Sequence, residues 1–267
     1  MTVFQAVVLG VLQGIAEFLP ISSSAHLSLA PWVFGWEDPG LAFDVALHVG
    51  TLVAVLWYFR AEWARLVGAA LSIVRDRGAR TVEQRRVIHL VIATIPGAIA
   101  GLLLEKHAES TFRAPALTAS ALIVMGLILW IVDVRASRDR PLERMTWRQA
   151  LLIGLAQMFA LIPGVSRSGA TMTAGRALGF DRRDAAVFSF LMLMPITAAA
   201  AVLKLPELLH AQGMTTPLVA GILSSAISGW LAIAFLLRLL NRHGFGVFAA
   251  YRVALGAVVL VLLAVRG

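Results

Sequence analysis

The residues best suited to chemistry in this 267-residue chain lie in two short polar segments of otherwise apolar sequence. The first, EFLPISSSAH, runs from Glu17 to His26 and contains a carboxylate, three hydroxyls and an imidazole. Gln13 lies four residues before Glu17, so the two side chains share a helix face. A membrane-embedded segment avoids such groups unless they are functional or paired. The segment therefore predicts a polar site inside an apolar protein.

The roles within this segment follow from residue type. Glu17 is the only one of the 15 acidic residues that lies deep in an apolar stretch. It is either a packing group neutralised by an arginine or a metal ligand or acid–base group, and we favour the chemical role. Ser23 and His26 are close enough on a helix for a serine nucleophile beside a base, or for an attacking imidazole. The nucleophile stays open, because a serine such as Ser22 or Ser24 is also an ordinary helix N-cap.

The second segment, PGVSRSGAT from Pro163 to Thr171, has the composition of an anion-binding turn. The Arg167 guanidinium can hold two oxygens of one phosphate, and the start of a helix supplies free N–H groups. Arg167 could also serve as a counter-charge to Glu17, and the two roles are compatible. The expected phosphate-binding residues, which offer hydroxyl or backbone N–H groups, are Ser22, Ser24, Gly164, Ser166, Ser168 and Thr171.

Other polar residues have weaker assignments. His48, within FDVALHVGT, either lines the mouth of the site or is a satisfied helix histidine. His89, Arg176 and Arg252 lie near the ends of apolar spans, where we expect them to snorkel or to cap helices.

The two polar segments occupy equivalent positions of an internal repeat. The chain begins MTVFQAVVLGVLQGIAEFLPISSSA, and from residue 145 it reads MTWRQALLIGLAQMFALIPGVSRSG. At a constant offset of 144 residues, 9 of these 25 positions are identical without a gap. We therefore predict a first repeat over 1–134 and a second over 145–267, each a polar segment (1–34 and 145–180) followed by three spans.

The composition identifies an integral membrane protein. The chain is 59% hydrophobic and only 14% charged, whereas soluble domains carry about 25% charged residues. Its cysteine-free sequence excludes disulfides and thiolate sites. We predict an all-α polytopic membrane protein with six transmembrane helices and two re-entrant broken-helix hairpins. Apolar windows long enough to cross about 30 Å of hydrocarbon lie at 43–59, 87–104, 115–134, 184–203, 217–240 and 246–265.

The distribution of arginine sets the expected topology. Segments 60–86 and 134–147 are arginine-rich and should be cytoplasmic, with 105–114 and 204–216 outside. This asymmetry accounts for the net charge of +8, so we expect no nucleic-acid partner. Because three spans per repeat is an odd number, the repeats should be inverted. Hairpin 1–34 would then enter from outside and hairpin 145–180 from the cytoplasm, and the two would meet at a cavity near the midplane.

The motifs together resemble those of the bacterial undecaprenyl-diphosphate phosphatase family, which is tied to bacitracin resistance. QGIAEFLPISSSAH (13–26) and PGVSRSGAT (163–171) carry the resemblance, and Tyr251-Arg252 extends it. That family removes the terminal phosphate from a C55 isoprenoid diphosphate, with a divalent cation, at the outer side of the bacterial plasma membrane. The resemblance implies catalytic roles for Glu17, Ser23, His26 and Arg167.

The resemblance also implies a Mg²⁺ or Ca²⁺ ion held by Glu17, with Gln13 as the further candidate ligand. Many family members carry Glu where this chain has Gln13. The partner expected is the C55 prenyl diphosphate lipid itself, and a homodimer remains possible. The rival function is a lipid flippase or secondary transporter, since inverted repeats with broken helices suit alternating access. The concentration of phosphate-handling groups in both hairpins favours the hydrolase.

Overall fold

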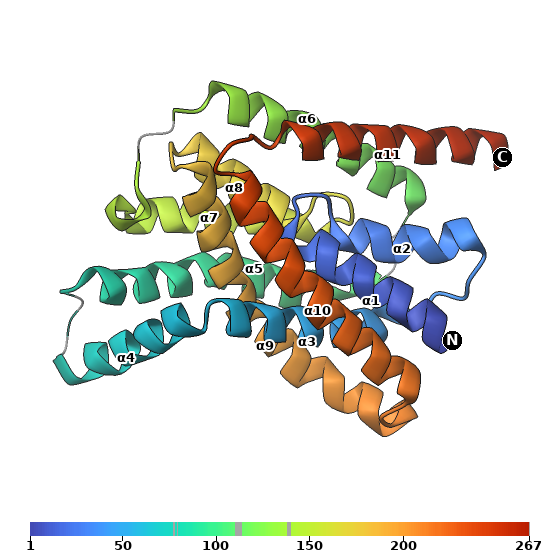
Figure 1. Ribbon diagram of the computed structural model, residues 1–267, viewed down its shortest axis with the longest axis horizontal. Coiled ribbons are helices and arrows are strands. Elements are labelled where there is room, and N and C mark those ends of the chain that lie inside the picture. The colour runs from blue at the N-terminus through green and yellow to red at the C-terminus, as the bar shows by residue number, and fades with distance from the viewer. Residues whose placement is uncertain (77, 79, 110–113, 138–139, 267) are drawn as a thin grey trace.

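The computed structural model describes residues 1–76, 78, 80–109, 114–137 and 140–266, and within them the chain is an assembly of helices (Figure 1). No β-strand forms in these ranges, where one isolated bridge joins Arg140 and Phe180. Short 3₁₀ helices cover Leu142–Arg144 and Phe159–Leu161. The α-helices are α1 (Val3–Phe18), α2 (Ser23–Phe34), α3 (Gly40–Tyr58), α4 (Arg60–Asp76), α5 (Val82–Glu109), α6 (Pro115–Arg135), α7 (Trp147–Met158), α8 (Arg167–Ala177), α9 (Arg182–Gln212), α10 (Thr216–Leu239) and α11 (Gly246–Arg266).

Six of the described helices are long and apolar enough to cross a membrane, which confirms the expected number of transmembrane helices. They coincide with the six apolar windows of the sequence. The spanning stretches are Gly40–Tyr58, Val82–Leu104, Pro115–Arg135, Arg182–Leu203, Thr216–Leu239 and Gly246–Val265.

The two polar segments fold as short helical pairs with matching local structure. The first pair is α1 and α2, and the second is α7 and α8, the latter joined through the 3₁₀ helix Phe159–Leu161. Thr2 and Thr146, which are equivalent in the repeat, each begin a helix with a reciprocal capping box. Ser22 and Ser166, also equivalent, each cap the second helix of their pair. How the two halves are oriented in a membrane stays a prediction.

Equivalent glycines bring the first helix of each pair close to a spanning helix of the other half. α1 packs mainly against α10, and α7 against α5 (Figure 1). A Cβ atom on Gly10 of α1 would lie 2.3 Å from the carbonyl oxygen of Gly221, and one on Gly154 of α7 would lie 2.4 Å from that of Ala93. Small residues permit this backbone approach in membrane proteins. The crossings fix where each polar turn lies.

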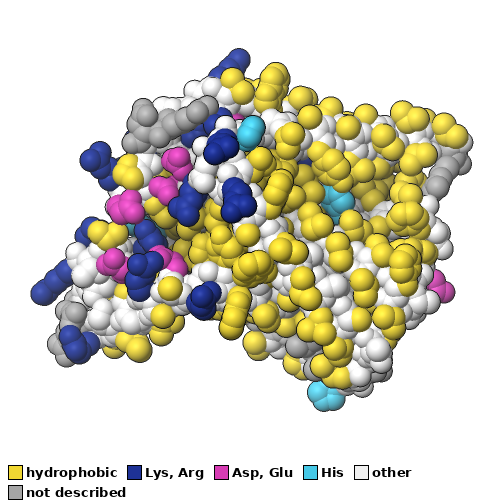
Figure 2. Space-filling model, viewed as in Figure 1, with side chains coloured by type: hydrophobic (Ala, Val, Ile, Leu, Met, Phe, Trp, Pro, Cys, Tyr) yellow, Lys and Arg dark blue, Asp and Glu magenta, His cyan; other side chains and the backbone are white. Residues whose placement is uncertain are grey.

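The arginine-rich segment 60–86, expected as a loop, contains the helix α4. The expectation missed its amphipathic pattern: Leu66 and Ala69 are buried, and Trp63 packs against the same apolar cluster as Leu90 of α5. Arginine side chains gather at the end of the molecule that carries α4 and the start of α5 (Figure 2). The segments expected outside are also partly helical, because α5 continues to Glu109 and α9 to Gln212. Of the expected loops, residues 77, 79, 110–113 and 138–139 lie outside the described residues.

Arg176 and Arg252, expected to snorkel or to cap, are completely buried and therefore do not snorkel. Arg176 does cap, because it donates to the backbone carbonyls of Asp133 and Ala136 at the end of α6, at 3.4 and 3.2 Å. Arg176 donates through Nε to Asp133 Oδ1 at 2.9 Å, and Arg182 donates to the same carboxylate at 2.7 and 2.9 Å. His89 is also buried, with 9% of its surface exposed. Position near the end of a span does not reveal which way a side chain points, and here neighbouring helices enclose all three.

Candidate active site

Glu17 lies at the centre of the polar site, buried at the end of α1 with 5% of its surface exposed. Oε1 of its carboxylate pairs with the Arg167 guanidinium. Oε2 accepts the Ser23 hydroxyl at 2.6 Å and the Gln13 amide at 3.1 Å, and lies 3.3 Å from His48 Nε2. The site therefore joins α1, α2, α3 and α8, and it assembles four of the sequence-predicted residues.

His48 completes the charge balance around Glu17. Its Nδ1 lies 2.7 Å from the backbone carbonyl of Asp44, which can only accept, while Nε2 faces the carboxylate. Only a doubly protonated ring donates to both partners. Glu17 is thus flanked by Arg167 and by a histidine placed to carry positive charge. Sequence reasoning left His48 open between this role and a merely satisfied histidine.

Arg167, the first residue of α8, reaches the site from the second helical pair. Besides Glu17, its guanidinium donates to the Thr197 hydroxyl of α9 at 3.3 Å. Its side chain keeps 18% of its surface exposed, so these contacts do not enclose it completely. Thr197 is 3% exposed and was not anticipated, because an isolated threonine in a long apolar span gives no sequence signal.

The turns before α2 and α8 touch each other directly. Ser22 Oγ accepts from the Gly164 N–H at 3.1 Å, and Ser168 Oγ donates to the Leu19 carbonyl at 3.2 Å. Ser22 and Ser166 have φ of 77° and 70°, and no other non-glycine in the described chain has positive φ. Such conformations cost about 1–3 kcal/mol and persist only where surrounding contacts enforce them. The two turns are therefore held in strained, matching shapes beside Glu17.

Most of the expected phosphate-binding groups are used to build these turns. Ser22 and Ser166 cap helices, and the hydroxyl oxygen of each lies 3.2 Å from that of the serine two residues later, Ser24 or Ser168. Thr171 lies 2.7 Å from the Ser189 hydroxyl and donates to the backbone of α8. Whether any of these hydroxyls also contacts a ligand stays a prediction. In the structure, the contacts of these hydroxyls hold the two turns and the start of α8 in shape.

Arg252 of α11 ties both turns together. Its guanidinium donates to the carbonyl oxygens of Pro20 at 3.1 Å, Gly164 at 2.7 Å and Val165 at 2.9 Å, and to Leu122 of α6 at 3.3 Å. All four described acceptors are backbone carbonyls. A planar guanidinium with five donors suits this arrangement. Arg252 is thus placed to fix the relative position of the two turns.

His26 lies one helical turn beyond Ser23 and faces a different direction. Its Nδ1 donates to the Ser22 carbonyl at 2.7 Å, and its Nε2 lies 2.7 Å from the hydroxyl of Tyr251. The two rings are stacked, 5.7 Å apart and 6° from parallel. Among the described contacts, the group next to the Ser23 hydroxyl is Glu17, and His26 is paired with α11.

Comparison with known proteins identifies the family of this chain. A family model described as "Bacitracin resistance protein BacA" matches residues 6–258. The chain belongs to this family. An undecaprenyl-diphosphatase of Gemmatimonas aurantiaca is 57% identical over 266 residues and covers 100% of both chains. Those of Pelotomaculum thermopropionicum and Moorella thermoacetica are 50% and 49% identical, with 100% of this chain covered and 98% and 100% of theirs.

The BacA match confirms the resemblance that the two motifs indicated, and it contains both of them. It also contains Thr197 and Arg252, which the motifs alone did not bring into the site. In this BacA-family chain, the site combines the Arg167 guanidinium, the buried Glu17 carboxylate and the Ser23 hydroxyl, and the carboxylate contacts the other two groups. That combination can hold a phosphoryl group and deprotonate an attacking oxygen.

The residues present fit a divalent cation only in part. No group of three or more His, Cys, Asp or Glu side chains suited to a metal occurs in the described residues. Beside Glu17, however, Gln13 is fully buried and its Oε1 has no hydrogen-bond partner. Carboxylate and amide oxygens suit Mg²⁺ or Ca²⁺, and Mg²⁺ takes many of its ligands from water and substrate phosphate. The donor set fits a cation that arrives with a phosphate ligand better than one held by protein alone.

Proposed function

We propose that this chain is an undecaprenyl-diphosphatase, which hydrolyses undecaprenyl diphosphate to undecaprenyl phosphate and inorganic phosphate and so recycles a lipid carrier for cell-wall synthesis. The names of relatives that match the whole chain support this activity. The observation that carries it is the contact of Glu17 with both Ser23 and Arg167 where the two turns meet. The rival, a flippase or transporter, has no such support in the relatives' names.

Arg167 binds the substrate diphosphate in this proposal. In the structure its guanidinium is paired with Glu17, and a bound phosphate would compete for it with a higher charge. Moving Arg167 from carboxylate to phosphate would keep its charge paired and would release Glu17 to accept a proton. The contact thus couples arrival of substrate to activation of the base.

Ser23 is the nucleophile that the contacts favour. Its oxygen attacks the terminal phosphorus while its proton passes to Glu17 Oε2, 2.6 Å away. The bond to the bridging oxygen breaks, and undecaprenyl phosphate leaves while Glu17 passes the Ser23 proton on to it or to water, which makes the carboxylate a base again. Water then attacks the phosphorus, and Glu17 takes a proton from this water. Glu17 returns that proton to the Ser23 oxygen as the serine–phosphate bond breaks, to give inorganic phosphate and free Ser23. Attack by His26, or by water that His26 activates, is the alternative, and it requires His26 to leave Tyr251.

A divalent cation, Mg²⁺ or Ca²⁺, completes the proposed site. Gln13 Oε1 and the Glu17 carboxylate would hold it, since one lacks a partner and the other carries charge. When bound, such a cation neutralises charge on the diphosphate. The remaining ligands would be phosphate and water oxygens.

We further propose that the protein lies in the bacterial plasma membrane with this site open to the outer side. The arginine-rich end in Figure 2 supports that orientation through the positive-inside rule. The C55 lipid is the partner that the site requires, with no nucleic acid. A homodimer is an added possibility that the sedimentation of the detergent-solubilised protein would decide.

Phosphate release from C55 diphosphate by the purified protein tests the activity. Wild type should release phosphate, and a chelator should abolish release until Mg²⁺ or Ca²⁺ is restored. Arg167→Ala, shown to be folded by its thermal transition, is the matched inactive control. Release that is equally fast from the two proteins would overturn the proposal.

A further inference from the structure

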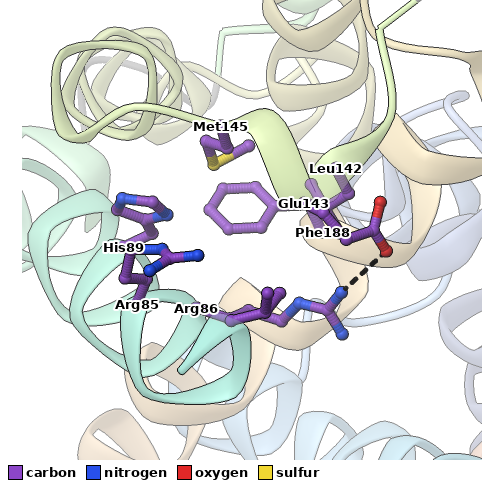
Figure 3. A pocket seen from close by; sticks show the side chains of 8 residues that line it. Arg85, Arg86, His89, Leu142, Glu143, Met145 and Phe188 are labelled. Atoms are coloured by element: carbon purple, nitrogen blue, oxygen red, sulfur yellow. Dashed lines mark hydrogen bonds and ion pairs between the residues drawn. The ribbon is translucent and has the colours of Figure 1, made fainter. Parts of the chain in front are cut away.

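A second cluster of basic side chains surrounds a small cavity away from Glu17 and Arg167. It lies between the first turns of α5, the 3₁₀ helix Leu142–Arg144 and the start of α9 (Figure 3). None of its lining residues has a described contact with Glu17, Ser23 or Arg167. The lining residues are Val82, Arg85, Arg86, His89, Leu142, Glu143, Met145 and Phe188.

His89 is the buried polar group of this cavity. The residue is 9% exposed, and its ring makes no hydrogen bond in the described part of the chain. The ring nitrogens are not fully enclosed by protein, so they can reach a group in the cavity that His89 lines. In Figure 3 the imidazole lies at the edge of the cavity beside Arg85 and faces Phe188. The ring is therefore placed to donate to a group that enters the cavity.

Arg85 adds a charge without an acidic partner. It lies four residues before His89 on the same helix face, and its guanidinium donates to the backbone carbonyl of Arg80 at 3.1 Å. Within the described ranges no carboxylate lies within ion-pair distance of it. Arg86, by contrast, is paired with Glu62 and lies 3.5 Å from Glu143. After this pairing the cavity keeps an excess of positive charge.

The opposite wall of the cavity is apolar. Leu142, Met145 and Phe188 belong to one buried hydrophobic cluster. Arg85 and His89 lie near the start of the spanning stretch Val82–Leu104. The end of a spanning helix is where lipid headgroups are expected to meet the hydrocarbon. Basic pockets between transmembrane helices at this depth suit the phosphate of an anionic lipid. A cationic wall facing an apolar one favours a phosphate group over a carboxylate-rich protein segment.

We propose that Arg85 and His89 form a binding site for a phosphate group, borne by a membrane lipid or free as the inorganic anion. One phosphate oxygen accepts from His89 inside the small cavity, and the others contact Arg85 at its mouth. If the proposed function holds, this is a second phosphate-binding site, in addition to the one at Arg167. Binding of phosphate by Arg85 and His89 does not depend on that function.

The test uses the full-length protein carrying Arg167→Ala, so that phosphate binding at the proposed active site does not contribute. Native mass spectrometry would measure retention of phosphatidic acid against diacylglycerol, which lacks the phosphate. Phosphorus NMR would measure binding of inorganic phosphate. Both kinds of binding are measured for four proteins. These are the Arg167→Ala parent and the same protein with Arg85→Gln, with Arg85→Gln and His89→Gln together, or with the control change Arg60→Gln. Arg60 is exposed on α4, where it lies over the Trp57 ring, outside the cavity.

We expect the parent and the Arg60 control to prefer phosphatidic acid, and the double variant to bind it at least about tenfold more weakly. A loss confined to phosphatidic acid identifies a lipid headgroup site, and a parallel loss of inorganic phosphate binding identifies a site for the free anion as well. Arg85→Gln, a change at an exposed side chain, keeps the test valid if the double variant unfolds. Binding of both ligands by Arg85→Gln as strong as in the Arg60 control would overturn the proposal, whatever the activity assay shows.

Discussion

At the residue scale, the central feature is that one carboxylate has four different donors. Glu17 accepts from Arg167, Ser23 and Gln13 and faces His48, so its charge is balanced before any ligand arrives. Buried charges are retained when they are paired and hydrogen-bonded. The same pairing means that a substrate phosphate can rearrange the site through a single move of Arg167.

Replacing Glu17 by Gln should abolish phosphate release, because the amide cannot take the Ser23 proton and no longer pairs with Arg167. The matched control is Gln13→Glu, which keeps the oxygen beside Glu17 and should remain active with altered cation dependence. Both are measured as kcat at several Mg²⁺ concentrations. Near-normal turnover by Glu17→Gln would show that its carboxylate is only a packing group.

Arg167→Lys should lower kcat/KM at least about tenfold, and Arg167→Ala far more. A guanidinium holds two phosphate oxygens at once, whereas an ammonium is a point charge. One lost charge-assisted contact is worth about 1.5–3 kcal/mol, and about 1.4 kcal/mol is one decade in rate. The loss should be the same for prenyl diphosphates of any chain length. Turnover of Arg167→Lys at the wild-type rate would reduce Arg167 to a counter-charge for Glu17.

Ser23→Ala should prevent a phosphorylated intermediate that wild type forms. Mass spectrometry of acid-quenched protein would detect an acid-stable phosphate on Ser23, whereas His26 would give an acid-labile one. His26→Gln, which can keep hydrogen bonds to its neighbours, should still form the serine adduct. An adduct on His26, or none together with direct attack by water, would contradict the role proposed for Ser23.

At the element scale, α11 matters because Tyr251 and Arg252 reach both turns from one helix. Tyr251 holds His26, while Arg252 donates to carbonyls before α2 and before α8. The turns also contact each other through Ser22 and Ser168. The site is therefore positioned by backbone contacts between segments far apart in the chain.

Arg252→Lys should lower kcat at least about tenfold with little change in KM, because an ammonium cannot span carbonyls of both turns and small misplacements of reacting groups are costly. Arg176→Lys is the control, since Arg176 is equally buried but bonds Asp133 in a different network. It should lower the thermal midpoint while leaving kcat of the folded protein nearly unchanged. Equal effects of the two variants on kcat would mean that Arg252 only supports folding.

The helix crossings make a second prediction at this scale. Gly10→Ala and Gly154→Ala should each lower the free energy of unfolding by about 1–3 kcal/mol, because the added methyl would meet a backbone carbonyl. Gly101→Ala, in α5, should be neutral or slightly stabilising, because beyond the neighbouring backbone of its own helix no atom lies within 4 Å of the new methyl. Thermal unfolding in detergent measures all three. Equal midpoints for the three variants would contradict close packing at the crossings.

At the scale of the whole molecule, the sequence predicted what local pattern determines. Six spans follow from apolar length, and Glu17 and Arg167 stood out because charged residues are rare in apolar hairpins. The helix α4 was missed, because its arginines masked the apolar face that packs on α5. Arg252 was misassigned for a different reason: its partners are backbone carbonyls distant in sequence, such as Pro20 and Gly164, and these leave no trace in residue type.

The last prediction concerns the orientation of the molecule in the membrane. Single introduced cysteines can test it, because the chain has no native cysteine. If the arginine-rich end faces the cytoplasm, Arg75→Cys in the last turn of α4 should be shielded in intact spheroplasts and should react with an impermeant maleimide only after lysis. Met214→Cys, on the exposed turn before α10, should react without lysis. The two positions follow the first spanning helix of the first and of the second repeat. If one is cytoplasmic and the other outside, the two repeats must have opposite orientations in the membrane. Reaction of Arg75→Cys alone in intact spheroplasts would reverse the orientation and move the proposed site opening to the cytoplasmic side.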